Sequence, residues 1–264
     1  MKPCARAADL FSLATLTSAP DYGSKLPRLL ADMGDASSVE VAADLFRRAI
    51  RLIGADAGVF MSATREATSR TSFRSLLACD PLWAIEYSRG NWHENDPWLR
   101  HATFNEEPIR SAELTPLAHE MEFVRKSADL GFASAVIVPA PSSVGSSRVG
   151  VLSIGSRDPL FFDDEGYRPA RVLARSLAME LHRWLLKAIR AELLARSRLT
   201  DKEIELLRQE DAGLPSKVIA ANLNIDASAV DRRFQRLCAK LAVPDRRTAS
   251  RIARLYGLLN ADRS

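Results

Sequence analysis

The sequence is poor in cysteine. Its 264 residues include three, Cys4, Cys79 and Cys238, which lie far apart and form no CxxC motif. An uneven number at such spacings predicts neither a disulfide framework nor a zinc cluster, and it suits a reducing compartment. We therefore expect a cytoplasmic protein without a metal site.

Long apolar runs are also missing. No run approaches the roughly 20 residues that a membrane-spanning helix needs, so we expect no membrane partner. The start of the chain follows the order of a signal peptide, with basic, then apolar, then small side chains. Asp9 interrupts the apolar part, and we expect no export.

The chain has no strong excess of one charge. It carries 37 Lys and Arg against 33 Asp and Glu, a net charge of +4, which permits an anionic partner without requiring one. With 47% hydrophobic and 27% charged residues, the composition is that of a globular protein. The length allows one large domain or two ordinary ones.

Motifs that carry catalysis do not occur. The four histidines form no HExxH motif and no ligand pair with cysteine, and "GVLSIG" lacks the spacing of a GxSxG elbow. There is no GxGxxG or phosphate loop. His93 near Asp96 could form a catalytic pair, but a histidine in a loop beside a turn is usually solvated. We expect no enzyme activity and no cofactor.

Helices and strands alternate in the first two thirds of the chain. After weak helical signals in residues 1–37, a helix ends at Gly54, with one apolar face: Val41, Leu45, Ala49 and Ile53. "AGVFMSAT" then predicts a strand, and "AHEMEFVRKSADLG" a helix closed by Gly131. "SAVIVPAPSSVGSSRVGVLSIGS" predicts two strands around a Ser/Gly loop, and a long helix runs from about Arg171 to Arg198.

The pattern changes near Leu199. Thr200 and Glu203 form a capping box, Gly213 ends that helix, and Pro215 begins another. Asn224 suits a left-handed turn position, and Asp226 can cap the helix that follows. A last helix spans about residues 246–259.

These signals predict an α+β fold with two domains. We expect an N-terminal α/β/α sandwich with an antiparallel sheet, and a C-terminal all-α helix-turn-helix domain of four helices. The expected boundaries are an extension over 1–37, a sandwich over 38–189, a linker over 190–198 and the helical domain over 199–264.

Positive charge concentrates in the helical domain. From Leu199 onward there are twelve Lys and Arg against nine Asp and Glu, which is three of the four net charges. The second helix of the turn carries four bases, Arg232, Arg233, Arg236 and Lys240, opposite the apolar residues Val230, Leu237 and Leu241. Such a helix can present side chains to the major groove, although a solvated basic helix in a plain bundle has the same pattern. Our DNA-binding set is Lys217, Ser228, Arg232, Arg233, Arg236, Arg246 and Arg247, with Lys217, Arg246 and Arg247 placed for phosphates.

This domain resembles the DNA-binding domain of LuxR-type transcription regulators. The matching positions are Glu203, Leu207, Gly213, Ile219, Ala220, Val230, Lys240 and Leu241. The departures are Pro215, Val218 and Asp231. An acid on the reading helix should repel phosphate unless it accepts from a cytosine amine.

Scarce aromatic residues gather in "WAIEYSRGNWHENDPW". Trp83, Tyr87, Trp92 and Trp98 surround a turn-forming Asp96-Pro97, in a chain with four Trp and four Tyr. Taken alone, the stretch could be plain core packing. It resembles the ligand-binding signature of the LuxR-type subclass that senses acyl-homoserine lactones, in which Trp83, Tyr87, Asp96 and, further on, Ser153 match.

The resemblance implies a role for each polar group of such a ligand. Asp96 accepts from the amide N–H, the Trp83 indole donates to the ring carbonyl, and Ser153 donates to the amide carbonyl. Tyr87 walls the acyl chain. Four further positions depart from the family and should alter the pocket: Cys79, Ser111, Ala135 and Ile137. Trp92 and Trp98 are expected to pack.

The resemblance thus implies a ligand-responsive DNA-binding regulator. The expected ligand is an acyl-homoserine lactone or a related small amide, the autoinducer of quorum sensing. A homodimer would bind a roughly two-fold-symmetric double-stranded operator. The alternatives are a ligand-independent or ligand-inhibited regulator of the same fold, and a module that uses its basic helix to bind protein.

Overall fold

The computed structural model describes residues 12–20, 22–67, 70–142 and 147–259. Cys4, the signal-like start and residues 143–146 of the Ser/Gly loop lie outside the described residues. The chain divides into two compact units, the first comprising 1–65 and 71–184, the second 66–70 and 185–264.

The first unit is built on a five-stranded sheet in the order β2-β1-β5-β4-β3. The strands are β1 (Ala57–Ala67), β2 (Arg70–Leu77), β3 (Ile109–Arg110), β4 (Ser134–Ala140) and β5 (Arg148–Ser156). β4 and β5 pair antiparallel, so the predicted hairpin is confirmed, and β1 pairs antiparallel with β5. β2 and the short β3 have no counterpart in the sequence prediction.

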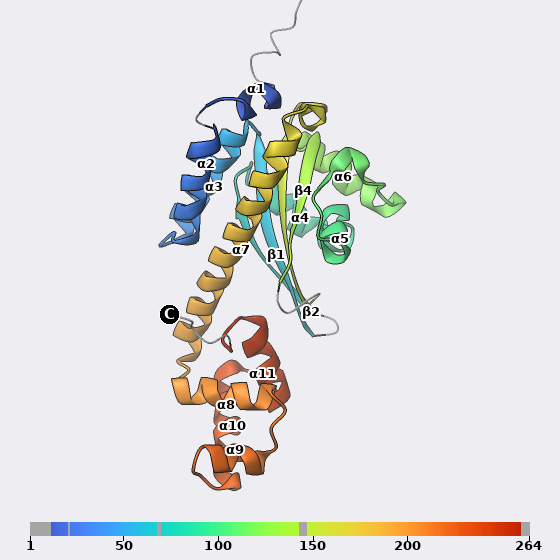
Figure 1. Cartoon of the computed structure of the whole chain (residues 1–264). Helices are drawn as coiled ribbons and strands as arrows, with labels where there is room; N and C mark the ends of the chain where they lie inside the picture. The colour runs from blue at the N-terminus through green and yellow to red at the C-terminus, as the bar shows by residue number, and fades with distance from the viewer. Residues whose placement is uncertain (1–11, 21, 68–69, 143–146, 260–264) are drawn as a thin grey trace, which may run out of the picture. The chain divides into compact units, whose positions relative to one another are not determined.

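Helices cover both faces of this sheet. In Figure 1, α2, α3 and the long α7 lie on one face, and α4, α5 and α6 lie on the other. The bounds are α1 (Leu13–Thr17), α2 (Tyr22–Gly34), α3 (Val39–Ile53), α4 (Leu82–Arg89), α5 (Pro97–Phe104), α6 (Met121–Asp129) and α7 (Tyr167–Ser197). The predicted α/β/α sandwich is therefore confirmed.

The helix predicted to end at Gly54 is α3. Gly54 has φ 83° and donates its backbone N–H to the last turn, which is the usual C-terminal cap. Leu45, Ala49 and Ile53 are buried as predicted, but Val41 is 42% exposed. Val41 lies in the first turn of α3, where the shared apolar face begins.

The segment before α3 adds to the core. Leu13, Leu26 and Met33 of α1 and α2 are fully buried, and α2 packs along α3. The Trp184 indole donates to the Ala36 carbonyl oxygen over 2.9 Å, which ties α7 to the loop after α2.

Alternation along the strands divides the core into two layers. The register places Val59, Ser153 and Ile137 side by side on β1, β5 and β4. Because alternate side chains point to opposite faces, these three share one face and Phe60 and Leu152 share the other. A side chain at Gly58 would meet Phe46 and Ile50 of α3, so the second face is the one that α3 covers.

The second unit holds the helices that the capping signals predict. They are α8 (Asp201–Asp211), α9 (Ser216–Asn222), α10 (Ala227–Leu241) and α11 (Arg246–Leu255). Thr200 and Glu203 form the expected capping box, Asn224 has φ 51°, and Asp226 caps α10. Leu207, Ile219, Val230 and Leu237 meet in its core.

The segment suggested as a linker is largely helical. Residues 190–197 form the last turns of α7, where Leu193 is buried with the core of the second unit. The helix ends where Arg198 adopts φ 49°. A chain of good helix formers without Gly or Pro carries no local signal to stop earlier.

Candidate functional site

Four large aromatic side chains pack into one cluster on the Ser153 face of the sheet. Trp83 and Tyr87, one turn apart on α4, stack with their ring centroids 4.7 Å apart. Trp92 and Trp98 pack edge-on against Phe123 of α6, at 5.3 and 4.8 Å. Each of the four is at most 7% exposed. The packing expected of Trp92 and Trp98 is confirmed.

Asp96 lies among these rings and begins α5. One carboxylate oxygen, Oδ1, accepts from the backbone N–H groups of Trp98 and Leu99 at 2.8 and 3.1 Å, and Pro97 takes the first helical position. The other oxygen, Oδ2, accepts from the Tyr87 hydroxyl at 2.9 Å. The prediction of a turn at Asp96-Pro97 is therefore wrong: Asp followed by Pro is a helix start here.

Burial sets the electrostatics of this acid. Asp96 is 4% exposed, and burial raises the pKa of its carboxyl group to about 6. The three hydrogen bonds act against that rise, because each favours the ionised form. Burial and the neighbouring Asp96 charge also raise the pKa of Tyr87, so its hydroxyl stays a donor.

Two groups in the cluster keep hydrogen-bonding capacity. A carboxylate can accept about four hydrogen bonds, and three are in place at Asp96. The Trp83 indole N–H is buried and has no acceptor among the described residues. A buried donor and a buried acceptor thus lie on neighbouring elements, α4 and the start of α5.

The sheet supplies three of the other predicted ligand-binding residues. Ala135, Ile137 and Ser153 are at most 3% exposed, and the two apolar ones pack in the aromatic cluster. The Ser153 backbone lies directly across from Ile137.

Ser111 and Cys79 lie at the margins of the cluster. The Ser111 hydroxyl accepts from the Ala135 backbone N–H at 2.9 Å. It therefore satisfies a backbone donor of β4 just past the end of β3. Cys79 packs partly buried against the cluster, and burial raises the pKa of its thiol to about 12. A protonated thiol is a poor nucleophile, which agrees with a space-filling role.

Sequence reasoning missed an ion pair beside the cluster. Arg100 of α5 donates twice to Glu120, from Nε at 2.6 Å and from Nη2 at 2.9 Å. Glu120 is 2% exposed and also accepts from the Leu117 backbone N–H at 2.7 Å. The pair holds residues 115–120 against α5. Its partners are twenty positions apart around a loop, so no local pattern could have indicated it.

The second unit presents a basic helix face. Ser228, Arg232 and Arg236 recur every fourth residue of α10 and are exposed, as are Lys217 and Arg247. Side chains four apart lie on one side of a helix, so the three on α10 form a single stripe. This arrangement fits the predicted DNA-binding surface.

Two of the basic side chains also bond to groups within the domain. Arg246 donates to the Ser216 hydroxyl at 2.8 Å, approaches Glu210 at 3.3 Å and covers the Phe234 ring. Lys240, expected on the outer face, pairs with Glu203 at 2.7 Å. Partners distant in sequence decide these contacts.

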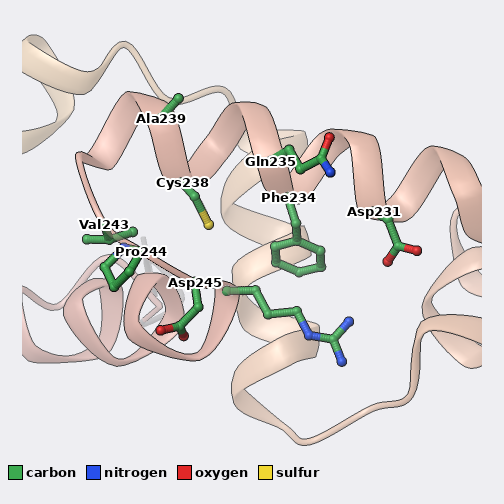
Figure 2. Close-up of a pocket in the computed structure, with 9 residues that line it drawn as sticks. Asp231, Phe234, Gln235, Cys238, Ala239, Val243, Pro244 and Asp245 are labelled. Atoms are coloured by element: carbon green, nitrogen blue, oxygen red, sulfur yellow. The ribbon is translucent and has the colours of Figure 1, made fainter.

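A shallow groove of about 620 Å³ runs along α10 beside the basic stripe. Figure 2 shows Asp231 at one end and Val243 and Pro244 at the other, with the Phe234 ring between them.

The described ranges contain no metal site and no membrane span. Within them, no group of three His, Cys, Asp or Glu side chains could hold a metal ion. No helix there is both long and apolar enough to cross a membrane.

Comparison with known families decides the relationship. Residues 38–185 match the family described as autoinducer binding domain, and residues 197–253 match the bacterial regulatory proteins of the luxR family. The chain belongs to the LuxR family of regulators. Its members regulate transcription and are not enzymes, so the resemblance drawn from the sequence is confirmed, and the second unit contains the family's DNA-binding helix-turn-helix.

Solved structures share the fold of this LuxR-family regulator. The crystal structure of Escherichia coli SdiA has a TM-score of 0.68 at 17% identity, covering 90% of this chain and 99% of that one. SdiA in complex with octanoyl-rac-glycerol gives 0.65 at 16% identity, with 92% and 98% covered. The N-acylhomoserine lactone dependent factor CepR2 from Burkholderia cenocepacia gives 0.51 at 19%, with 61% and 95% covered. A search of curated proteins finds no match.

Proposed function

We propose that this LuxR-family regulator binds an acyl-homoserine lactone or a related acyl amide at Asp96, and that the ligand controls DNA binding by a homodimer. One observation carries the ligand half: the cluster holds a buried donor, the Trp83 N–H, and a buried acid, Asp96, whose carboxylate has accepted three of the about four hydrogen bonds it can take. A buried polar group without a partner costs roughly 1–3 kcal/mol. A ligand with one acceptor and one donor removes that cost.

The acyl amide fits both groups. Its amide N–H would occupy the last acceptor position of Asp96, and a lactone carbonyl oxygen would accept from Trp83. Tyr87 already donates to Asp96, so the carboxylate is held in place before the ligand arrives. Ser153, on the same face of the sheet, would serve the amide carbonyl.

A hydroxyl could replace the amide. SdiA has been solved with octanoyl-rac-glycerol, whose hydroxyl groups are donors. CepR2 is described as dependent on N-acylhomoserine lactone. Asp96 needs only a donor beside an acyl chain, so either ligand would satisfy it. Trp83 needs a carbonyl at the far side of the head group, which the lactone ring supplies, so Trp83 favours the acyl amide.

Linkage would connect the ligand to DNA binding. A ligand at a hundred times its dissociation constant adds about 2.7 kcal/mol to the stability of the folded state. The same free energy favours a dimer if the ligand-bound form associates. Two α10 helices would then bind a roughly two-fold-symmetric operator.

The test compares the wild-type chain with Asp96→Asn. Asn keeps the helix cap but has no charge and can turn an N–H toward the ligand. We expect N-octanoyl-homoserine lactone to raise the wild-type melting temperature and its affinity for DNA, and to do neither in the variant. 1-Octanoylglycerol, tested in parallel, separates the hydroxyl from the amide.

The rival is a ligand-independent regulator. Its signature would be wild-type protein that binds operator DNA equally well with and without the lactone, with an unchanged melting temperature. That result would overturn the ligand half of the proposal and leave the assignment to the LuxR family intact.

A further inference from the structure

Asp231 differs from the other acids of its domain. Between residues 199 and 259, most acids are bound to a base or to a helix N-terminus. Asp226 and Asp245 cap α10 and α11, and four more pair with bases: Glu203, Glu205, Glu210 and Asp211. Asp201 lies in the first turn of α8, where the helix dipole favours an acid. Asp231 has no cap role and no ion pair with any described residue.

Its position is on the side of α10 that is open to solvent. Asp231 lies in the second turn of α10, next to Arg232 of the basic stripe, and both are exposed. Gln235, one turn later, is also exposed and lines the same groove (Figure 2). In a helix-turn-helix, the residues in the N-terminal part of the second helix contact base edges. Asp231 is therefore in the part of the helix that meets the bases.

An acid there is costly unless it accepts a hydrogen bond. It repels the phosphate backbone, which supplies a large share of the affinity of DNA-binding proteins. In the major groove only cytosine N4 and adenine N6 are donors, whereas guanine O6 and N7 and thymine O4 are acceptors. The adenine amine stands beside N7, which would repel the second carboxylate oxygen, so cytosine is the base that fits.

We propose that Asp231 is a specificity-determining residue that accepts from the N4 amine of a cytosine in each half of the operator. The proposal rests on the DNA-binding role of α10 and adds the base that one residue selects. Arg232 beside it would pair with guanine or phosphate. If it pairs with guanine, the two residues read bases of opposite hydrogen-bonding character.

The test selects binding sites from a library of random 20-bp duplexes. The full chain is used, with and without N-octanoyl-homoserine lactone, as wild type, Asp231→Ala and Asp231→Asn. We expect wild type to prefer cytosine by about tenfold at one symmetric pair of positions. Asp231→Ala should lose that preference, and Asp231→Asn should move it toward adenine, which Asn pairs at N6 and N7. All other positions should be unchanged.

The matched control is Asp201→Asn, which removes an exposed acid of the same domain away from α10. It should leave every base preference as in wild type. If Asp231→Ala retains all wild-type preferences, or strengthens binding to all sequences equally, Asp231 does not read a base, and the proposal is overturned while DNA binding stands. If wild type enriches no sequence under either condition, sequence-specific binding itself fails and the proposal falls with it.

Discussion

At the scale of single residues, the candidate site depends on two buried polar groups that differ in their hydrogen-bond partners within the protein. Asp96 would be retained without any ligand, because it caps α5 and fixes the Tyr87 hydroxyl. Trp83 has no such reason to keep its N–H, since the described residues offer that group no acceptor. Trp83 is therefore the sharper probe of ligand binding.

Replacing Trp83 by Phe should separate ligand binding from stability. The variant loses the indole N–H and would leave a buried ligand carbonyl unpaired, which costs roughly 1–3 kcal/mol. We expect its affinity for N-octanoyl-homoserine lactone to fall about tenfold, measured by calorimetric titration. Trp92→Phe is the control, because Trp92 loses the same ring area in the same cluster. Equal losses in both variants would show that ring packing, and not the N–H, determines affinity.

At the scale of elements, local signals predicted well wherever the chain itself supplies the cap. Gly54 closes α3, Thr200 and Glu203 open α8, and the β4–β5 hairpin forms as the pattern indicated. These features depend on neighbours within a few positions, so they are visible in the sequence.

Features that depend on distant partners were missed. β3 has two residues and exists only because β4 is beside it. Arg246 bonds to Glu210 and Ser216, which lie on other helices. The internal partners of Asp96 required the packing of α4 against α5. The assignment of ligand contacts remains a prediction for the same reason, since it needs a partner from outside the chain.

The end of α10 offers a prediction for one backbone position. Ala242 caps the helix at φ 54° and ψ 47°, a left-handed conformation that costs an L-residue roughly 1 kcal/mol. Ala242→Gly should therefore stabilise the domain by up to about 1 kcal/mol. Ala239→Gly, three positions earlier inside the same helix, should destabilise it by a similar amount. Hydrogen exchange of the α10 amides measures both, and the same sign in both variants would contradict the argument.

Two arginines on neighbouring helices should respond differently to removal. Arg232 is exposed, so Arg232→Ala should keep the melting temperature and weaken DNA binding, with a smaller salt dependence if it contacts phosphate. Arg246→Ala should lower the melting temperature, because it removes the partner of buried Glu210. Circular dichroism and fluorescence anisotropy at several salt concentrations distinguish the two. A stable Arg246→Ala protein that binds DNA weakly would instead show that Arg246 acts mainly as a DNA contact.

At the scale of the whole molecule, the first unit buries two titratable groups of opposite effect. Burial raises the pKa of Asp96 to about 6 and lowers the pKa of His182, which is 5% exposed on α7, to about 4. Arg148 adds to the fall at His182 through its charge. The ordinary pKa values of these two side chains are 3.8 for Asp96 and 6.5 for His182, so both groups act in the same pH window.

The signs of the two contributions are opposite. Between about pH 4 and 6 the unfolded chain has lost the Asp96 proton while the folded chain still holds it, so this group lowers the free energy of unfolding as the pH rises. Between about pH 4 and 6.5 the unfolded chain binds a proton at His182 that the folded chain refuses, so this group raises stability as the pH rises. Each contribution is worth about 3 kcal/mol, and in the wild type they largely offset each other.

Removing either group should therefore uncover the other. Relative to wild type, Asp96→Asn should gain about 3 kcal/mol in its free energy of unfolding between pH 4 and 6.5, and His182→Gln should lose about as much. Urea unfolding followed by tryptophan fluorescence measures this in the first unit alone, because Trp83, Trp92, Trp98 and Trp184 all belong to it. The double variant should run parallel to wild type, since a constant packing penalty does not depend on pH. If both single variants keep a constant difference from wild type across this range, burial shifts the pKa of neither Asp96 nor His182. The ionised Asp96 carboxylate, which the ligand requires, would then not destabilise the folded chain as its buried surroundings indicate.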